Sequence, residues 1–435
     1  MGSKWVHAKL GDYIHSNLGK MLDQNKNKGD FQPYLGNSNV RWGYFDLEDL
    51  SLMKFEEHES DRYGIRKGDL IICEGGEPGR CAIWEDDVPN MKIQKALHRV
   101  RPLPGLTSEY LYYWFLYFGR TGQLDAYFTG TTIKHLTGKA LSELPIKIPT
   151  VDEQKYISIV LGSLDAKIKA NRKINRTLEQ MSQTLFKSWF VDFDPVIDNA
   201  LDAGNPIPEA LQSRAELRQK VRNSENFKPL PADIRVLFPA EFEETELGYA
   251  PKGWMTNRLE NILELAYGKA LKKTERTNGN YPVYGSGGVD GTHNEYLVKG
   301  PGVIVGRKGT VGSLHWENKN FYPIDTVFFV KPKEYYSLVY CYQLLKTLGL
   351  ENMNTDAAVP GLNRNNAYRL EVVTPTQSII AKFTNIIQTI QHKMDSNHNE
   401  TENLTALRDT LLPKLISGEL SLEDLPDLVT QTEPA

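Results

Sequence analysis

The chain has 435 residues, 40% of them hydrophobic and 10% aromatic, which suits a folded protein of about two to four domains. Its 51 Lys and Arg residues stand against 55 Asp and Glu, and the net charge of −4 excludes a general electrostatic case for nucleic acid, so any DNA contact must come from local basic clusters. Three scattered cysteines exclude a disulfide framework or a zinc site, and the strongest apolar run, residues 111–118, is too short to span a membrane, so we expect a reduced, cytoplasmic protein.

Residues 1–148 are predicted to form a first globular domain of mixed helix and strand. The β-rich run 69–73 lies between Gly-rich turns, and a helical stretch follows at about 108–118. Segment 74–79 is rich in glycine but lacks the Lys and Ser/Thr that end a nucleotide-binding loop, so we expect a turn between strands there.

A long amphipathic helix is predicted over residues 149–194, and a Pro-rich crossover follows at 195–252. Prolines interrupt the crossover from Pro195 to Pro251, and one charged amphipathic helix is expected at about 209–222. This composition indicates an ordered or partly ordered connection rather than a catalytic domain.

The same order of parts then returns. A second globular domain is predicted at 253–373, with a strand at 302–305 and a helical stretch at about 335–348. A second long helix is expected at 374–420, and a C-terminal tail at 421–435.

The two long helices carry one apolar pattern at a fixed offset. Ile157 falls on Phe383 and Ile168 falls on Met394, since 383 − 157 and 394 − 168 both give 226. The positions of the first helix that match an apolar residue in this way are Ile157, Val160, Leu161, Leu164, Ile168, Leu178, Met181 and Leu185. A constant offset over so long a stretch indicates a tandem duplication.

The globular domains also align, at offsets that shrink along the chain. Lys20 matches Lys269 at 249, and residues 71–72 match 303–304 at 232. With the first offset, residues 37–39 lie opposite residues 286–288. The second domain is therefore expected to be the same fold with shorter loops and different side chains.

Heptad spacing of the apolar residues in each long helix predicts a coiled-coil seam. At 1.5 Å per residue, about 35–40 residues span roughly 50–60 Å. We predict that the two helices pair antiparallel, which would place the globular domains at opposite ends and bring Asn171 against Asn397. Buried asparagines of this kind fix the register of a coiled coil, and the alternative is that both face solvent.

The order of parts is domain–helix–domain–helix, and the chain contains several distinctive local motifs. They are Asn-Val-Arg-Trp-Gly at 39–43, Tyr-Pro-Val-Tyr-Gly-Ser-Gly-Gly-Val at 281–289, Val-Ile-Val-Gly-Arg-Lys-Gly at 303–309, Leu-Phe-Lys-Ser-Trp-Phe-Val-Asp-Phe-Asp-Pro at 185–195 and Leu-Arg-Asp-Thr-Leu-Leu-Pro-Lys-Leu-Ile-Ser-Gly-Glu-Leu at 407–420. Together they resemble the specificity subunit of type I restriction–modification systems over essentially the whole chain. These motifs are specific in combination and weak singly.

The resemblance implies an α+β fold, in which two duplicated mixed α/β target recognition domains are joined by two long helices that form an antiparallel coiled coil. Each domain would read one half of a bipartite, asymmetric site on double-stranded DNA. The helices would set the gap and dock two methyltransferase subunits, which bind S-adenosylmethionine and methylate adenine. Two restriction/translocase subunits join them in systems that cut unmodified DNA. The chain itself is expected to hold no cofactor and no metal.

Side chains that read base edges are mainly Arg, Lys, Asn and Gln, and phosphates are held by Lys, Arg, hydroxyls and backbone amides from loops on rigid strands. Candidates in the first domain are Lys20, Asn37, Asn39, Arg41, Thr131, Thr132 and Lys134. Candidates in the second are Lys269, Lys272, Lys273, Ser286, Arg307, Lys308, Asn363 and Arg364. Lys20 and Lys269 stand out because they recur after a glycine at equivalent positions. A solvated surface charge or a turn residue is the alternative for each.

No catalytic residue is predicted. His135 and His315 have no nucleophile or paired carboxylate at a recognisable spacing, and the sequence lacks an Asn-Pro-Pro-Tyr type motif and a Gly-rich cofactor loop. A non-catalytic DNA-recognition subunit is therefore favoured. A stand-alone restriction–methylation enzyme and a coiled-coil scaffold that never touches DNA stay open as alternatives.

Overall fold

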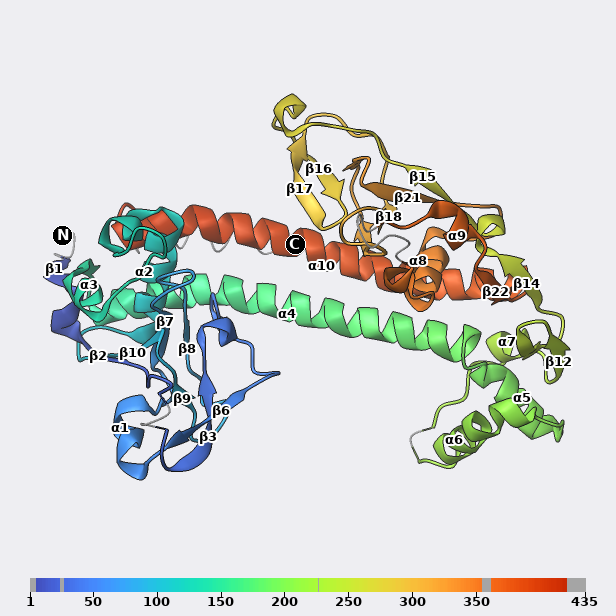
Figure 1. Cartoon of the computed structure of the whole chain (residues 1–435), viewed down its shortest axis with the longest axis horizontal. Helices are drawn as coiled ribbons and strands as arrows, with labels where there is room; N and C mark the ends of the chain where they lie inside the picture. Colours follow the sequence, from blue (N-terminus) through green and yellow to red (C-terminus); the bar gives the residue numbers. More distant parts are fainter. Residues whose placement is uncertain (1–4, 24–26, 226, 354–360, 421–435) are drawn as a thin grey trace. The chain divides into compact units, whose positions relative to one another are not determined.

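The chain divides into two compact units in this computed structural model. The residues that it describes are 5–23, 27–225, 227–353 and 361–420. One unit combines residues 1–170 with 400–435, and the other comprises residues 171–399. Each unit thus contains one globular half together with segments of both long helices, α4 (Val151–Phe190) and α10 (Gln377–Ser417) (Figure 1). The predicted tail at 421–435 lies outside the described residues.

The first globular half is mixed, as predicted. Its strands are β1 (Val6–Lys9), β2 (Ile14–Leu18), β3 (Asp30–Leu35), β4 (Val40–Arg41), β5 (Tyr44–Phe45), β6 (Ser51–Phe55), β7 (Leu70–Cys73), β8 (Cys81–Ile83), β9 (Lys92–Ile93), β10 (Leu97–Pro102) and β11 (Pro145–Ile148). Its helices are α1 (Ser60–Tyr63), α2 (Ser108–Arg120) and α3 (Gly138–Glu143). One sheet has the strand order β2-β10-β7-β8, a second has the order β6-β3-β9, and β1 pairs with β11.

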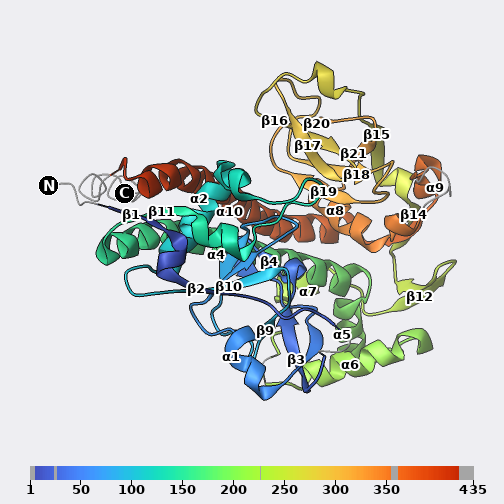
Figure 2. The same ribbon diagram turned by 60° about the vertical axis from the view of Figure 1, so that its left-hand side comes forward.

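The second globular half contains a matching set. Its strands are β14 (Met255–Arg258), β15 (Leu263–Tyr267), β16 (Tyr281–Gly285), β17 (Gly288–His293), β18 (Gly302–Gly306), β19 (Leu314–Glu317), β20 (Tyr322–Pro323), β21 (Val327–Pro332) and β22 (Glu371–Thr374). Its helices are α8 (Leu338–Thr347) and α9 (Arg364–Tyr368). The four-stranded sheet β15-β21-β18-β19 and the three-stranded sheet β17-β16-β20 are separate sheets of this half (Figure 2).

The two halves agree down to hydrogen-bond register. The orders β2-β10-β7-β8 and β6-β3-β9 recur as β15-β21-β18-β19 and β17-β16-β20. The amide of Gly19, directly after β2, donates to the Leu97 carbonyl at 2.9 Å. The amide of Gly268, directly after β15, donates to the Val327 carbonyl at 3.2 Å. The predicted duplication is therefore confirmed at the level of single backbone bonds.

Each half buries its core beneath a capped helix. The Thr107 hydroxyl accepts a hydrogen bond from the Tyr110 amide at the start of α2, and Ser337 does the same for Tyr340 at the start of α8. Residues 110–116 of α2 are all buried, and so is every residue of β7 and β18. The strands and helical stretches predicted in each half are confirmed.

The long helices pair within each unit. In the unit formed by 1–170 and 400–435, Arg408 Nη1 donates to Asp165 Oδ1 at 2.6 Å, and Lys167 Nζ lies 3.5 Å from Glu400 Oε1. Residue numbers on α10 fall as those on α4 rise. The two helices therefore run in opposite directions here.

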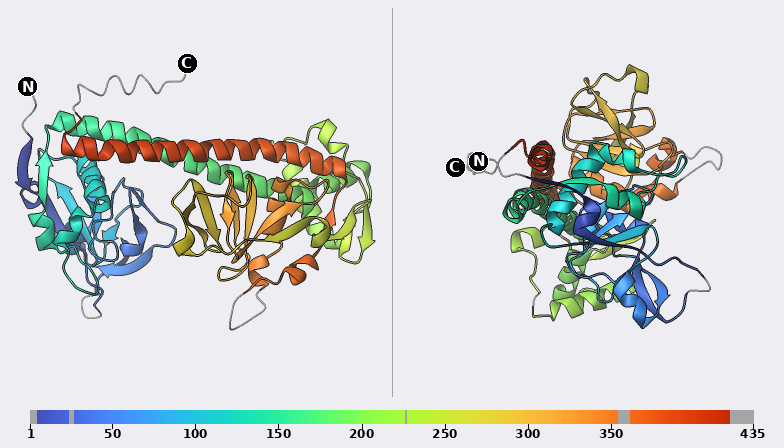
Figure 3. Two further views of the ribbon diagram at one scale, coloured as in Figure 1. Left: turned by 90° about the horizontal axis from the view of Figure 1, so that it is seen from above. Right: turned by 90° about the vertical axis from the view of Figure 1, so that its left-hand side faces the viewer.

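The 171–399 unit shows the same direction of pairing. Asn397 Nδ2 donates to Asn175 Oδ1 at 2.8 Å, and the ring centroids of Phe186 and Phe383 are 5.6 Å apart. The second globular half lies along α10 in this unit (Figure 3). Trp316 Nε1 of that half donates to Asp395 Oδ1 of α10 at 3.2 Å. The predicted antiparallel coiled coil is confirmed in both units.

The centre of the helix seam is polar, as the sequence predicts. Asn171 and Asn397 are each 2% exposed, which removes the alternative that they face solvent. Asn397 bonds to Asn175, one helical turn along α4 from Asn171. Met181 and Leu407, which the duplication pairs with each other, are instead 53% and 38% exposed. These two residues lie outside the narrow seam. Burial in the seam therefore does not explain why both equivalent positions are apolar.

The described part of the crossover contains helices and one two-stranded sheet. Its elements are α5 (Asp194–Ala203), α6 (Gln212–Arg222), α7 (Ala232–Arg235), β12 (Phe242–Thr245) and β13 (Gly248–Pro251). The charged helix predicted at 209–222 is confirmed as α6 with one preceding turn. Pro195 does not interrupt α5 because it occupies the first turn, where a proline fits.

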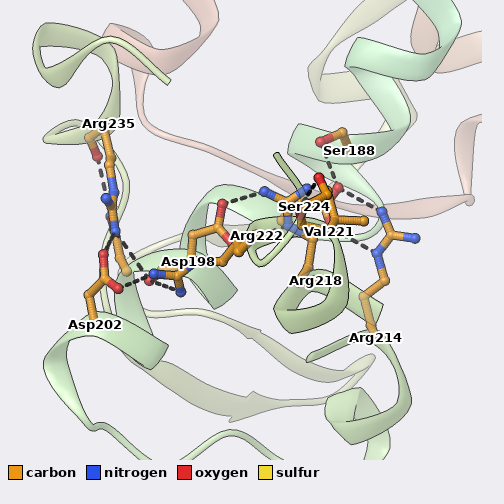
Figure 4. Close-up of polar contacts among 11 residues, drawn as sticks. Ser188, Asp198, Asp202, Arg214, Arg218, Val221, Arg222, Ser224 and Arg235 are labelled. Atoms are coloured by element: carbon orange, nitrogen blue, oxygen red, sulfur yellow. Dashed lines mark hydrogen bonds and ion pairs between the residues drawn. The ribbon is translucent and has the colours of Figure 1, made fainter. Parts of the chain in front are cut away.

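Ion pairs hold α6 against α5 (Figure 4). Aspartates lie four residues apart on α5 and arginines lie four residues apart on α6, so each set occupies one helix face. The pairs are Asp194–Arg214, Asp198–Arg218 and Asp202–Arg222. Arg235 of α7 also bonds to Asp202, and hydrogen bonds from Arg235 and Arg222 lower the pKa of that carboxyl. These ion pairs therefore hold the helices of the crossover together.

Among the described residues, no helix is long and apolar enough to cross a membrane.

Candidate nucleic-acid interface

Basic side chains from three segments of the second globular half gather around one tyrosine. Tyr267 ends β15 and is 48% exposed. The guanidinium carbon of Arg307 is 4.9 Å from the centroid of its ring, and that of Arg364 is 4.6 Å away. Lys269 and Lys308, each within two residues of this group along the chain, are exposed. Four predicted candidates therefore belong to one site, although Tyr267 itself was not predicted.

Backbone hydrogen bonds fix the loops that carry this cluster. The amides of Arg307 and Lys308 both donate to the Thr326 carbonyl, at 2.9 and 3.1 Å. The amide of Leu362 donates to the Arg307 carbonyl at 2.8 Å. Since these amides are already used, DNA contacts here must come from side chains.

Asn363 serves as a helix cap. Its side-chain oxygen accepts hydrogen bonds from the amides of Asn365 and Asn366, at 2.9 and 3.3 Å, at the start of α9. The prediction that Asn363 contacts DNA is corrected for this oxygen, because it is already bound. The cap in turn places Arg364 in the first turn of α9.

Lys272 and Lys273 lie on an exposed turn with acidic neighbours. Lys273 Nζ is 3.0 Å from Asp290 Oδ1, and Lys272 Nζ is 3.9 Å from Glu275 Oε1. Hydrogen bonds from Lys273 and Arg276 lower the pKa of Asp290, which keeps its carboxyl ionised. Both lysines remain 77–80% exposed in their side chains. They stay candidates for phosphate contact.

The loop 129–135 is the exposed candidate of the first half. Its two end residues exchange backbone hydrogen bonds of 2.8 Å, which closes the loop. Thr131, Thr132 and Lys134 are exposed on it, and Lys134 Nζ lies 3.3 Å from Asp125 Oδ2. This placement fits the predicted role of the three residues in DNA contact and leaves it a prediction.

Two asparagines of the first half are engaged in turns. Asn39 Oδ1 accepts from the Gly36 amide at 2.9 Å, and its Nδ2 donates to the Asp46 carbonyl at 3.0 Å. Both ends of its amide thus make a turn contact, which supports a structural role, and a contact of Asn39 with DNA stays a prediction. Asn37 Nδ2 donates to the Gly75 carbonyl at 2.9 Å, while its Oδ1 has no hydrogen-bond partner among the described residues.

Arg41 lies next to a polar group that the sequence did not reveal. Trp42 Nε1 donates to Glu77 Oε1 at 2.7 Å, and Arg80 Nη1 donates to Glu77 Oε2 at 2.9 Å. Arg41 is half-buried and donates to the Val40 carbonyl at 3.3 Å. No motif spacing links residues 42, 77 and 80, so only the fold could bring them together.

Lys20 is a buried ion-pair residue, and its prediction as a phosphate contact is corrected. It is 3% exposed, and its Nζ lies 2.5 Å from Glu59 Oε2 and 2.9 Å from the Lys54 carbonyl. Burial alone would raise the pKa of Glu59, but the hydrogen bonds from Lys20 and the Glu56 backbone outweigh it and lower that pKa. Lys269 holds the equivalent position and is exposed. The environments differ because residues 57–63, which cover Lys20, belong to the first half alone among the described residues.

The alignment of the two halves needs two adjustments. The Leu136 amide donates to the Glu74 carbonyl as the Leu362 amide donates to that of Arg307, so Glu74 corresponds to Arg307 at an offset of 233 (307 − 74) rather than the predicted 232. Residues 37–50 form an insertion between β3 and β6, where the second half has only the tight turn at Ser286 between β16 and β17. Residues 37–39 therefore have no one-to-one partners at 286–288.

These equivalences show unlike side chains on one frame. The positions of Tyr267, Arg307 and Arg364 correspond to Leu18, Glu74 and Gly138 in the first half. An aromatic ring with two guanidinium groups is thus replaced by an apolar, an acidic and a glycine residue. The two halves present different chemistry at the same place.

The described residues contain no group of three or more His, Cys, Asp or Glu side chains that could hold a metal ion. His135 lies in the closed loop of the first half, and its backbone bonds to Thr129. His315 lies on β19, and its ring is 5.9 Å from that of Tyr284.

A duplicated frame with unlike basic loops, mounted on an antiparallel helix pair, defines a class of protein that recognises nucleic acid through two related domains. The sequence matches the family described as type I restriction modification DNA specificity domain at residues 2–180 and 251–405, and the chain belongs to this family.

Its relatives agree with this assignment. The chain is 25% identical over 473 residues to the type I restriction enzyme HindI specificity subunit of Haemophilus influenzae, with 96% of this chain and 100% of that protein covered. It is 26% identical over 370 residues to the MjaIX specificity subunit of Methanocaldococcus jannaschii, with 82% and 79% covered. Its fold is similar to the crystal structure of the type I restriction–modification system S subunit from M. genitalium, with a TM-score of 0.54, 19% identity, and 95% and 96% of the two chains covered.

Proposed function

We propose that this chain is the non-catalytic subunit that selects the DNA site of a type I restriction–modification complex. Each globular half reads one half of a bipartite, asymmetric site. The observation that carries the proposal is the pairing of one fold with unlike side chains, Tyr267, Arg307 and Arg364 against Leu18, Glu74 and Gly138. An asymmetric site of two parts requires two domains of the same fold that present different side chains to the DNA.

The paired helices set the gap between the half-sites in this proposal and dock two methyltransferase subunits. Those partners bind S-adenosylmethionine and methylate adenine, and two restriction/translocase subunits join in systems that also cut. The chain itself binds no cofactor. We place it in the cytoplasm, which is consistent with its three free, buried cysteines.

The direct test is to produce the chain with its methyltransferase partner in a host that lacks adenine methylation, and to sequence the methylated adenines. The expected result is one split motif with a fixed gap and two different half-motifs. A continuous motif, or methylation that is unchanged when this chain is omitted, would contradict the proposal.

Two binding measurements separate the alternatives. Calorimetry of the isolated chain with S-adenosylmethionine should show no binding, and tight binding would favour a stand-alone enzyme. A gel shift with methyltransferase subunits present should show DNA retardation that depends on this chain. A stable complex that never retards DNA would favour a coiled-coil scaffold.

A further inference from the structure

The most specific arrangement in the second half is a tyrosine that carries two arginines. Tyr267, Arg307 and Arg364 come from a strand end, a loop and a helix start, and both guanidinium groups lie within 5 Å of one ring, at 4.9 and 4.6 Å. Each arginine also touches a second ring, Phe328 at 5.7 Å for Arg307 and Tyr368 at 5.6 Å for Arg364. Such cation–π contacts restrict where a long, flexible side chain can point.

The donors of these arginines are largely unused. Arg307 Nη1 donates to the Asp325 carbonyl at 3.0 Å. The Arg364 guanidinium has no hydrogen-bond partner among the described residues, and its Nε is buried without one. A buried donor that lacks a partner costs free energy in the unliganded protein. The other guanidinium donors of Arg364, and those of Arg307 apart from Nη1, have no hydrogen-bond partner among the described residues, and they are therefore left for an acceptor from outside the chain.

The acceptor that best fits is the edge of a guanine. An arginine fork matches the N7 and O6 acceptors of guanine in the major groove, the commonest specific contact between protein and DNA. An arginine fork also fits a phosphate, but a mobile ammonium group holds a phosphate as well, so the guanine edge is the acceptor that gains most from two oriented forks. The exposed Lys269 and Lys308 beside the cluster supply that kind of group.

The first half lacks this arrangement. Leu18, Glu74 and Gly138 occupy the three equivalent positions, and none of them is an aromatic residue or an arginine. An acidic residue in place of Arg307 would repel the guanine acceptors. Guanine recognition by this device is thus confined to one half of the chain.

We propose that Arg307 and Arg364, oriented by Tyr267, read guanine in the half-site bound by the second globular half. Tyr267 is a positioning residue that acts through the arginines. The inference rests on the proposed function, because it assigns bases within the bipartite site.

The test uses the full chain in complex with its methyltransferase subunits and a DNA library randomised in one half-site at a time. The variants are Tyr267→Leu, which installs the residue of the first half, and Arg364→Ala. Both should lower the preference for guanine over other bases about 10-fold or more at one or two positions of a single half-site. The other half-site should keep its preferences.

Matched variants separate base reading from other roles. Tyr267→Phe keeps the ring and should retain the wild-type preference. Lys269→Ala should weaken binding to all sequences equally, as loss of a phosphate contact does. Melting curves of each variant establish that it folds, and the 48% exposure of Tyr267 makes a folding defect of Tyr267→Leu small.

Three results would overturn the inference. One is an equal loss of binding to all sequences in Tyr267→Leu and Arg364→Ala, which would make the arginines phosphate contacts. Another is that the half-site bound by the second globular half contains no guanine. The third is that both variants keep the base preferences of the wild type. If the wild-type complex selects no split site at all, the proposed function fails and the inference fails with it. Selection by the wild-type complex is measured first, so failure of the proposed function is recognised before any variant is tested.

Discussion

Asn397 of α10 donates a 2.8 Å hydrogen bond to Asn175 of α4, inside a helix seam that is otherwise largely apolar. The duplication relates Asn397 to Asn171, and both of these asparagines are 2% exposed. A buried polar contact of this kind stabilises little, but it penalises every register that leaves an amide unpaired. Asn175 thus joins Asn171 and Asn397 as a residue that sets the alignment of the helices.

Replacing Asn397 with Ala should lower the free energy of unfolding by about 1–2 kcal/mol, because Asn175 loses this partner in a half-buried site. Urea denaturation of the full chain measures the effect. Lys393→Ala, at an exposed position of the same helix, is the control. Equal stability of the two variants would show that the Asn397–Asn175 hydrogen bond does not stabilise the helix pair.

The two equivalent lysines should respond differently to substitution. Lys20→Met should cost about 2 kcal/mol of unfolding free energy, less than the 3–5 kcal/mol typical of fully buried pairs because the Glu59 side chain is 15% exposed. Lys269→Met should leave stability unchanged and should reduce the salt dependence of DNA binding by about one phosphate contact. Denaturation and salt-titrated gel shifts measure the two effects. A Lys20 variant of normal stability with weak DNA binding would restore the original assignment.

Acid should destabilise the first half through His98. Its Nε2 lies 2.8 Å from the Leu136 carbonyl, at the end of the loop 129–135. Burial lowers the pKa of His98 below its ordinary value of 6.5, against the opposing effects of the bond to Leu136 and the charge of Glu74. The unfolded chain therefore binds more protons below pH 6.5. Stability is full above that pH and falls as the pH drops through 6.5 towards the folded pKa.

Melting temperatures of the wild type and His98→Gln, measured at intervals from about pH 7.5 to about pH 5, check this effect. Glutamine keeps a donor for Leu136 but does not titrate, so the variant should lose less stability on acidification. Parallel curves for the two proteins would show that His98 is not the group responsible.

Lengthening both long helices by one heptad should widen the gap of the DNA motif and leave both half-motifs unchanged. A heptad adds about 10 Å along each helix and keeps the apolar positions of both helices facing each other. The inserts belong in α4 and α10 together, since one alone would misalign the pair. Methylome sequencing reports the gap, and an unchanged gap in a folded, active variant would refute the role of the helices as a spacer.

Much of the fold was readable from the sequence because the duplication left two copies of each signal. The offset of 226 between Ile157 and Phe383 identified the helices, and the strands at 69–73 and 302–305 are confirmed as β7 and β18. Shifts in the alignment arose where loops differ in length. The insertion at residues 37–50 has no apolar periodicity that would mark its ends.

The candidate site was only partly readable. Arg307, Lys308 and Arg364 were found because they are basic and follow strands or turns. Tyr267 was missed because an aromatic residue at a strand end is ordinary until the fold brings arginines over its ring. The turn contacts of Asn39 and Asn363 were not predicted, because an asparagine that caps a turn has the same local sequence as one that contacts a base.

The sequence alone determined the duplication, the two long amphipathic helices and the family, because periodicity and repeated motifs are local properties of a chain. Tertiary structure alone decided which lysine of the pair Lys20 and Lys269 is buried and which side chains meet at Tyr267. The physical reason is that burial and partnership depend on segments far apart in the chain, such as Glu59 and Lys20, whose approach no local pattern encodes.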